Sequence, residues 1–168
     1  YASSSAVYGD ADADVRREGE EGQPLSPYAA SKRINELYAA AFGRSYGMLA
    51  TGLRDFNLYG PRQDPAGEYA AVIPRWIGRL LRGEQCLIFG DGETSRDFTF
   101  VGDVVQANIA AALAPPTRDP TPVYNIGFGR RTTLNELHRL LRDAVAQHRP
   151  AAAAEKPAHQ PFRIGAVR

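Results

Sequence analysis

Tyr28 and Lys32 form the pair of residues in this sequence best placed to do acid–base chemistry. Ser26 suits a helix N-cap and Pro27 suits the first helical position, so a helix is expected to begin here. Apolar residues then recur at three- and four-residue spacing through 34–42, which gives one apolar stripe. Residues four apart share a helix face, so the phenol and the ammonium can converge. An ammonium within a few ångströms stabilises a phenolate, and such a pair can transfer a proton.

A Tyr-x-x-x-Lys spacing also arises by chance in a chain with 8 tyrosines. Composition weighs against chance here, because Lys32 and Lys156 are the only lysines among 20 basic Lys and Arg residues. Arg is planar and always charged, so it does not replace a lysine that must act as a compact ammonium. We interpret Lys32 as a functional lysine.

The composition sets limits on the class of protein. The length of 168 residues suits one globular domain, and a net charge of +1 gives no support to a nucleic-acid or anionic-membrane partner. The single cysteine, Cys86, excludes an internal disulfide framework and a multi-cysteine metal site, and it fits a reducing cytoplasm. We expect no metal, no membrane span and no signal peptide. Because the chain opens without Met inside a predicted strand, we expect a fragment.

Further polar candidates follow predicted strands. Residues 1–10 read as a buried parallel strand that ends in a loop, where Ser4 or Ser5 could donate to a substrate oxygen. Residues 48–58 read as a second strand, with Asn57 at its end as a possible ligand contact. An ordinary serine-rich strand end and a turn-stabilising asparagine are the alternatives, so these positions stay open on the residues alone.

The second half of the chain predicts more helices and strands. A helix is expected over 70–82, and a hairpin over 87–89 and 96–101 places Arg96 where it could bind a phosphate or pair with a neighbouring acid. Asp103 is expected to cap a helix through residue 112, and Thr133 opens a helix through 147 whose face with His138 is solvated. Residues 149–161 are expected to be mobile.

Four segments, in this order and at compatible spacing, resemble the extended short-chain dehydrogenase/reductase family of nucleotide-sugar epimerases and dehydratases. They are Ser4-Ser5-Ala6-Val7-Tyr8-Gly9, Tyr28-x-x-x-Lys32, residues 54–65 (RDFNLYGPRQDP) and residues 89–98 (FGDGETSRDF). The resemblance covers nearly the whole chain to about residue 147.

The resemblance implies an α/β fold: an incomplete Rossmann-type parallel sheet with a smaller sugar-nucleotide domain. Residues 1–60 would be the C-terminal part of the NAD-binding domain. Residues 61–168 would be mostly the substrate domain, with segments that return to the Rossmann sheet. The glycine-rich N-terminal half and the extreme C-terminus are expected to be missing, because no glycine-rich turn here follows a strand and opens a helix.

Family membership also implies roles for single residues. Tyr28 would take the proton from the sugar hydroxyl, and Lys32 would bind the nicotinamide ribose and stabilise the phenolate. Ser4 matches the residue that completes the catalytic triad, with Ser5 beside it. The substrate residues implied by the resemblance are Ser4, Ser5, Asn57 and Arg96, the last two on the diphosphate, and Gln63 and Ala71 along the sugar-nucleotide site.

The reaction expected from the resemblance is C4 epimerisation through a 4-keto sugar. Dehydratases of the family carry a carboxylate just before Val-Tyr-Gly, whereas this chain has Ser5-Ala6, so elimination lacks its general acid. Residues 62–74 look most like the bacterial UDP-N-acetylglucosamine 4-epimerases that supply surface polysaccharides. A UDP-glucose 4-epimerase, a reductase of the same family and a non-catalytic remnant that binds sugar nucleotide weakly are the alternatives. Relatives commonly dimerise through the Tyr-bearing helix, so a full-length homodimer is expected, although burial of the 34–42 stripe against its own sheet explains that stripe equally well.

Overall fold

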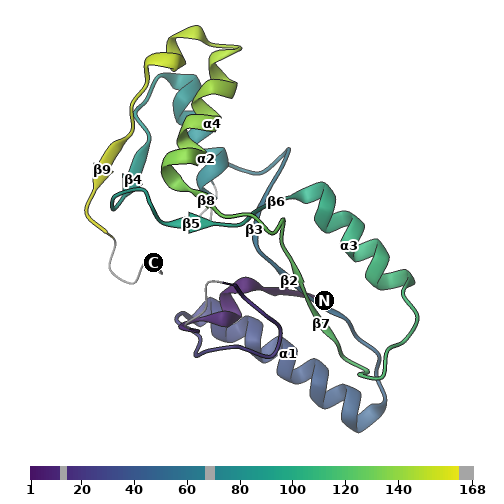
Figure 1. The fold of residues 1–168 in the computed structure, drawn as a ribbon. Helices are drawn as coiled ribbons and strands as arrows, with labels where there is room; N and C mark the ends of the chain where they lie inside the picture. The colour runs from purple at the N-terminus through teal and green to yellow at the C-terminus, as the bar shows by residue number, and fades with distance from the viewer. Residues whose placement is uncertain (12–14, 67–70, 163–168) are drawn as a thin grey trace. The chain divides into compact units, whose positions relative to one another are not determined.

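The computed structural model describes residues 1–11, 15–66 and 71–162 as helices and short strands (Figure 1). The elements, in chain order, are β1 (Ala2–Ser4), the 3-10 helix η1 (Ser5–Tyr8), α1 (Pro27–Tyr46), β2 (Gly52–Asp55), β3 (Asn57–Tyr59), α2 (Val72–Arg82), β4 (Leu87–Phe89), β5 (Ser95–Arg96), β6 (Phe98–Phe100), α3 (Val101–Leu113), β7 (Val123–Ile126), β8 (Thr132–Thr133), α4 (Leu134–Ala146), the 3-10 helix η2 (Pro150–Ala154) and β9 (Ala158–Gln160). No helix within these described ranges is long and apolar enough to cross a membrane.

The chain divides into two compact units, each built from two separate segments. Unit 1 contains Tyr1–Leu58 and Thr99–Phe128, and unit 2 contains Tyr59–Phe98 and Gly129–Arg168. The chain passes from one unit to the other three times: within β3, within β6 and between β7 and β8.

Unit 1 is built on a three-stranded parallel sheet in the order β1–β2–β7. The register pairs Ser4 of β1 with Asp55 of β2, and Asp55 with Ile126 of β7, so the carboxyl ends of all three strands lie at one edge. A parallel sheet with helical connections confirms the Rossmann-type class expected from the sequence. The long strand predicted over 48–58 is instead two short ones, β2 and β3, interrupted at Phe56.

Helix α1 begins and ends as its sequence predicts. Ser26 Oγ accepts a hydrogen bond from Ala29 N at 3.1 Å, and Gly47 closes the helix in the left-handed conformation with φ 65°. The face of α1 that is buried carries mostly small residues: Ala29, Glu36, Ala39 and Gly43. A Cβ added to Gly43 would lie 2.6 Å from Thr121 Cγ2, so only glycine allows this close approach of α1 to the segment before β7.

The large apolar residues of α1 lie on its other face. Their exposed fractions are Ile34 49%, Leu37 55%, Tyr38 64% and Phe42 45%. Burial of this stripe against the helix's own sheet, one of two explanations left open by the sequence, is therefore wrong for the described chain. The helix packs through small residues, which bring its backbone close to the sheet, and it leaves the bulky residues outside.

Unit 2 holds the hydrophobic core cluster of the described residues. Its buried members come from helices α2 and α4, from strand β4 and the residue before it, and from η2: Ile73, Trp76, Leu80, Cys86, Ile88, Leu137, Val145 and Ala152. Helix α2 begins at Val72, and the predicted start at Ala70 lies outside the described residues. The prediction that Trp76 belongs to the core is confirmed, because its side chain is 4% exposed.

The predicted hairpin over 87–101 is wrong. Strand β4 pairs in parallel with β9, and β5 pairs in the antiparallel sense with β8. The glycine-rich loop between β4 and β5 is held by other elements, because Gly90 N donates to Gln160 O at 2.8 Å and Asn135 N donates to Gly92 O at 3.1 Å. Both glycines have positive φ, of 90° and 81°, and this carries the chain away from a tight hairpin.

Two further expectations are corrected. Residues 149–161, which were expected to lack regular structure and be mobile, contain η2 and β9, and Ala152 is fully buried. Asp103 does not cap α3; Phe100 is the N-cap, without a side-chain hydrogen bond, and Asp103 lies in the first turn. A carboxylate in a first turn still favours the helix dipole, so the residue stabilises the same terminus in a different way.

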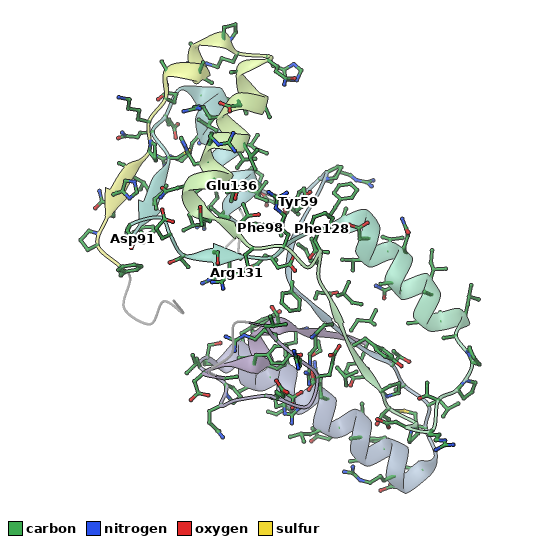
Figure 2. The ribbon with its side chains drawn as sticks, viewed as in Figure 1. Tyr59, Asp91, Phe98, Phe128, Arg131 and Glu136 are labelled. Carbon is green, nitrogen blue, oxygen red and sulfur yellow. The ribbon has the colours of Figure 1, made fainter. Side chains whose placement is uncertain are left out.

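Helix α4 begins with the predicted capping residue but buries a residue expected in solvent. Thr133 Oγ1 accepts a hydrogen bond from Glu136 N at 3.1 Å, with Glu136 labelled in Figure 2. Arg131, which directly precedes β8, donates from Nε to Ser95 Oγ of β5 at 2.9 Å and is also labelled in Figure 2. His138 is 3% exposed, and its ring meets Trp76 edge to face with centroids 5.7 Å apart. Burial among apolar side chains lowers the pKa of His138, and the neighbouring Arg142 lowers it further.

We predict that His138 makes stability depend on pH. Its folded-state pKa lies below the unfolded value of about 6.5, so the unfolded chain binds more protons as pH falls. Stability is therefore complete above about pH 6.5 and is lost as the pH falls through that value toward the folded-state pKa. Chemical unfolding at about pH 7.5 and about pH 5.5 should show this loss.

The same measurement on His138→Phe should remove the pH-dependent loss, because phenylalanine fills the site without a proton to bind. The exposed residue His148, changed to Gln, is the matched control and should retain it. An unchanged pH dependence in His138→Phe would contradict the assignment.

Candidate active site

Tyr28 and Lys32 lie in the first two turns of α1, as their spacing predicts. The Lys32 ammonium is 5.7 Å from the centroid of the Tyr28 ring, and Lys32 Nζ donates to Ala2 O of β1 at 3.2 Å. Tyr28 is 53% exposed in the described structure. The pair therefore sits at the surface of unit 1, with the lysine anchored to the first strand of the sheet.

Ser4 and Ser5 lie on the segment against which α1 packs. Helix α1 contacts both β1 and η1, and Ser4 is the last residue of β1. Ser4 Oγ accepts from Ala6 N at 3.2 Å, and its hydroxyl donates to no other described residue. Ser4 is 8% exposed and Ser5 is half-buried. The hydroxyl of Ser4 thus keeps its hydrogen available for another acceptor.

Asp55 of β2 lies next to Ser4 of β1 in the sheet. It pairs with Ser4 across β1 and β2, and its Oδ1 is buried without a hydrogen-bond partner among the described residues. Burial raises the pKa of the Asp55 carboxyl, against the opposing charge of Lys32. Sequence reasoning did not single out this residue.

A buried ion pair between Glu36 and Arg54 lies beneath the catalytic candidates. Arg54 Nε and Nη2 each donate to the Glu36 carboxylate at 2.8 Å, which is a two-point interaction of the guanidinium fork. Arg54 is 2% and Glu36 5% exposed. Glu21 and Arg33 extend the pair: Arg54 Nη1 is 2.5 Å from Glu21 Oε1, and Arg33 Nη1 is 2.7 Å from Glu36 Oε2.

Hydrogen bonds keep these buried groups charged. Burial alone would raise the pKa of the Glu36 carboxyl, but donors from Arg54, Ser3 and Arg33 outweigh it and hold that pKa below its usual range. Burial likewise opposes the charge on Arg54, yet its contacts with Glu36, Tyr8 and Glu21 raise its pKa. Both partners are therefore ionised at neutral pH.

The same network connects every strand of the unit 1 sheet to α1. Ser3 Oγ of β1 donates to Glu36 Oε1 at 2.5 Å, and Arg54 comes from β2. Arg54 Nη1 also donates to Tyr8 OH at 3.0 Å, and Tyr8 OH donates to Asn125 Oδ1 of β7 at 2.7 Å. Glu36 follows Lys32 by four residues and Tyr28 by eight, so one helix face carries all three. The network fixes the rotation of that face on the sheet.

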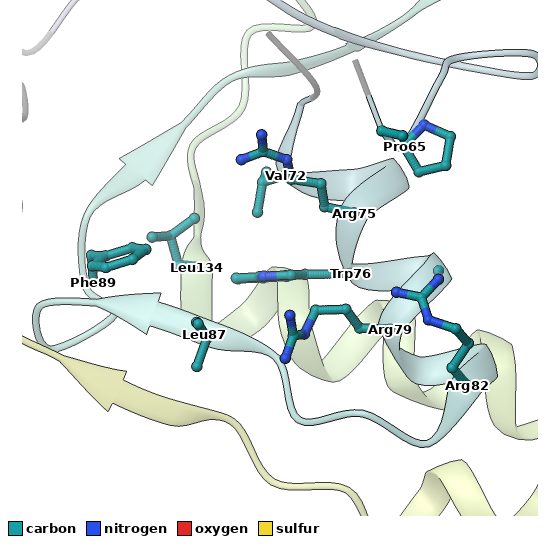
Figure 3. Close-up of a pocket in the computed structure, with 11 residues that line it drawn as sticks. Pro65, Val72, Arg75, Trp76, Arg79, Arg82, Leu87, Phe89 and Leu134 are labelled. Carbon is teal, nitrogen blue, oxygen red and sulfur yellow. The ribbon is translucent and has the colours of Figure 1, made fainter. Parts of the chain in front are cut away.

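Unit 2 contains a separate pocket of about 560 Å³ (Figure 3). Its lining combines apolar side chains, among them Val72, Trp76, Phe89 and Leu134, with the guanidinium groups of Arg75, Arg79 and Arg82. Arg79 and Arg82 face Glu84, whereas no ion pair of Arg75 is formed within the described residues. An apolar surface next to cationic groups suits a flat organic group that carries phosphate.

The remaining predicted substrate residues are distributed between the units. Asn57 opens β3 in unit 1, whereas Gln63, Ala71 and Arg96 belong to unit 2. Arg96 lies on β5, and its Nη1 donates to Ser95 O at 2.8 Å. Neighbours of Gln63 and Ala71, namely Pro65, Ala66 and Val72, line the pocket, but Gln63, Ala71 and Arg96 do not line it themselves.

Sequence reasoning missed the residues that hold the site in place, although two signals were present. Glu36 continues the four-residue spacing of Tyr28 and Lys32 along one helix face. Arg54 and Asp55 stand in a short strand, where charged residues are rarely buried unless they are paired. A charge inside a parallel strand is therefore a sequence signal for a network or a site.

Comparison with known proteins gives the family. Residues 1–127 match the model of the NAD dependent epimerase/dehydratase family, and this chain belongs to that family. A putative UDP-glucose 4-epimerase of Methanocaldococcus jannaschii is 39% identical over 155 residues, which cover 92% of this chain and 48% of that protein.

Solved structures agree with this membership. The UDP-N-acetylglucosamine 4-epimerase of Methanobrevibacter ruminantium M1, in complex with UDP-N-acetylmuramic acid, is 39% identical with a TM-score of 0.90, and the match covers 99% of this chain and 51% of that one. The UDP-glucose 4-epimerase of Thermotoga maritima with UDP-glucose is 41% identical with a TM-score of 0.87, over 99% and 51%. The chain thus spans about half the length of these relatives.

We predict that Arg54→Met lowers the free energy of unfolding by about 3–5 kcal/mol, because it leaves the Glu36 carboxylate buried without its main partner. The double variant Arg54→Met with Glu36→Met should recover much of this loss, since both charges are then removed. Denaturant unfolding of each variant measures the two effects.

Glu84→Gln is the control, because it breaks the exposed pair with Arg82 and should leave the unfolding midpoint unchanged. Equal loss in the single and double variants would contradict a direct Arg54–Glu36 coupling.

Proposed function

We propose that the full-length protein carrying this chain is an NAD-dependent UDP-sugar 4-epimerase. The observation that carries the proposal is that α1, with Tyr28 and Lys32 in its first turns, packs on β1, whose last residue is Ser4. Lys32 and the buried network join this helix to that strand. This grouping supplies a proton acceptor, a cation and a hydroxyl donor for one sugar hydroxyl. Membership in the epimerase/dehydratase family supports the same reading.

The proposed proton steps use residues of this chain. Ser4 donates its free hydroxyl hydrogen to the oxygen at C4 of the sugar and orients it. Tyr28, as phenolate, takes the proton from that oxygen when C4 becomes a ketone, and Lys32 stabilises the negative phenolate. When the 4-keto sugar has rotated in the site, its opposite face would receive the hydride at C4 while Tyr28 returns a proton to the oxygen, so the opposite C4 configuration results.

NAD is the cofactor that we propose, and it supplies the acceptor and donor of the hydride at C4. The residues near Tyr28 fit its nicotinamide end, because Lys32 has three donor hydrogens and one of them is used on Ala2 O. The remaining hydrogens would be available for ribose hydroxyls. The described glycine-rich segments do not form a strand–turn–helix for the pyrophosphate: Gly127 and Gly129 lie between β7 and β8.

For the substrate we propose UDP-N-acetylglucosamine, with UDP-glucose as the second candidate. Asn57 and Arg96 would hold the diphosphate, and the segments of Gln63 and Ala71 would line the sugar-nucleotide site. The aromatic and cationic lining of the unit 2 pocket supports a nucleotide ligand. A UDP-N-acetylglucosamine epimerase and UDP-glucose epimerases among the relatives support one candidate each. Ser5-Ala6 in place of a carboxylate supports epimerisation over elimination.

We predict that Tyr28→Phe lowers turnover of the full-length protein by at least about 100-fold, because the ring remains and the proton acceptor is lost. Incubation with UDP-N-acetylglucosamine and, separately, UDP-glucose, followed by proton NMR of the C4 epimer, measures turnover. Tyr46→Phe is the matched control, since Tyr46 is 78% exposed on the same helix. Retained turnover in Tyr28→Phe would assign the proton transfer to another group, and an inactive wild type would favour a non-catalytic protein.

We also propose that the full-length protein is a homodimer through the exposed apolar face of α1, formed by Ile34, Leu37, Tyr38 and Phe42. Covering these side chains removes apolar surface from water. Leu37→Glu should therefore convert the dimer to a monomer in light scattering after size exclusion. Leu140→Glu, at a 46% exposed position of α4, should leave the mass unchanged. A wild-type monomer, or a dimeric Leu37→Glu variant, would contradict this interface.

A further inference from the structure

Asp55 is a half-buried acid at the edge of the sheet where Ser4 lies, and its Oδ1 is buried without a hydrogen-bond partner among the described residues. It is the last residue of β2, and its register partner in β1 is Ser4. In parallel α/β sheets, ligands bind outside the carboxyl ends of the strands. Asp55 therefore lies at the edge of the sheet where a ligand is expected, beside Ser4 of the proposed site.

The strand geometry separates Asp55 from the buried ion pair. Successive residues of a strand point to opposite faces of the sheet, and Arg54 points to the face covered by α1, where it meets Glu36. Ser3 also points to that face, because it donates to Glu36. Asp55 and Ser4 thus point toward the opposite face of the sheet from Arg54 and Ser3. Asp55 has no part in the network that stabilises unit 1.

One carboxylate oxygen of Asp55 lacks a hydrogen-bond donor within the described chain. Buried polar atoms are normally hydrogen-bonded, and its Oδ1 is buried without a partner among the described residues. No ion pair joins Asp55 to Lys32 within the described chain, although the Lys32 charge acts on it. Burial raises the pKa of this carboxyl, because no hydrogen-bond donor of the described chain stabilises its charged form.

We propose that Asp55 is a further ligand-binding residue of the site, whose Oδ1 accepts a hydrogen bond from a hydroxyl or an amide N–H of the bound ligand. This assignment rests on the proposed function, because both ligands of an NAD-dependent sugar epimerase carry such donors. The donor is a hydroxyl or carboxamide of NAD, or a hydroxyl of the sugar. The carboxylate would hold that ligand next to Ser4, its register partner.

The test is equilibrium binding to the full-length protein, with NAD and UDP-N-acetylglucosamine titrated separately by calorimetry. Asp55→Ala should weaken one of the two ligands by about tenfold or more, which is the expected loss of a hydrogen bond to a charged acceptor. Asp55→Asn keeps an acceptor oxygen and the shape of the side chain, so it should recover part of the affinity. Asp103→Asn makes the same chemical change at an exposed position of unit 1 and should bind both ligands as the wild type does.

The two titrations distinguish the sources of the donor. Weaker NAD binding alone assigns the cofactor, and weaker sugar-nucleotide binding alone assigns the substrate. If the wild type binds both ligands and Asp55→Ala and Asp55→Asn bind them equally well, the assignment of Asp55 is overturned while the proposed function stands. If the wild type binds neither ligand, the proposed function falls and the Asp55 assignment falls with it.

Discussion

The buried pairing of Glu36 with Arg54 determines how the Tyr28-bearing helix sits on its sheet. Two charges that leave water lose several kilocalories per mole of solvation each, so the pair is stable only with close geometry and with its other polar atoms satisfied. Both conditions are met. The Arg54 guanidinium donates to both Glu36 oxygens, Ser3 donates a further hydrogen bond to Glu36, and Tyr8 and Glu21 contact the remaining nitrogen of Arg54. Any rotation of α1 would break several of these contacts together.

This constraint explains how an interface with few large apolar side chains can position the proposed catalytic groups. The buried face of α1 carries alanine, glycine and Glu36 rather than large aliphatic side chains. Small residues bring the helix close to the sheet but fix its rotation poorly, whereas a two-point ion pair is directional. Lys32, one turn before Glu36, reaches back to β1. Unit 2 is organised differently, around an apolar cluster on α2 and α4, and it offers an open pocket instead of an acid–base pair.

Local patterns predicted much of the fold. The Ser26 cap, the Pro27 start and the Thr133 cap are confirmed because each depends on hydrogen bonds within one turn. Pairings between distant segments failed: β4 was assigned to a hairpin, yet its partner β9 lies some seventy residues further along, in a stretch predicted to be mobile. Register between such segments depends on the packed core, which local spacing does not encode.

The candidate site was predicted unevenly for the same reason. Tyr28 and Lys32 share a helix, so their spacing alone predicted their proximity. Asp55 and Ser4 meet only through strand register, and the importance of Arg54 is visible only once α1 covers it. The apolar stripe of α1 was correctly placed on one face, but periodicity cannot say whether that face is buried in the same chain.

The most direct test of a Tyr28-centred epimerase is the fate of the hydrogen at C4 of the sugar. The full-length protein would be incubated with UDP-N-acetylglucosamine that carries deuterium at C4, without added cofactor, and both epimers would be followed by NMR. Reversible oxidation at C4 inside a closed site predicts that the C4 epimer forms and retains the deuterium. Epimer formation with hydrogen from solvent at C4, or dehydration in place of epimerisation, would contradict it.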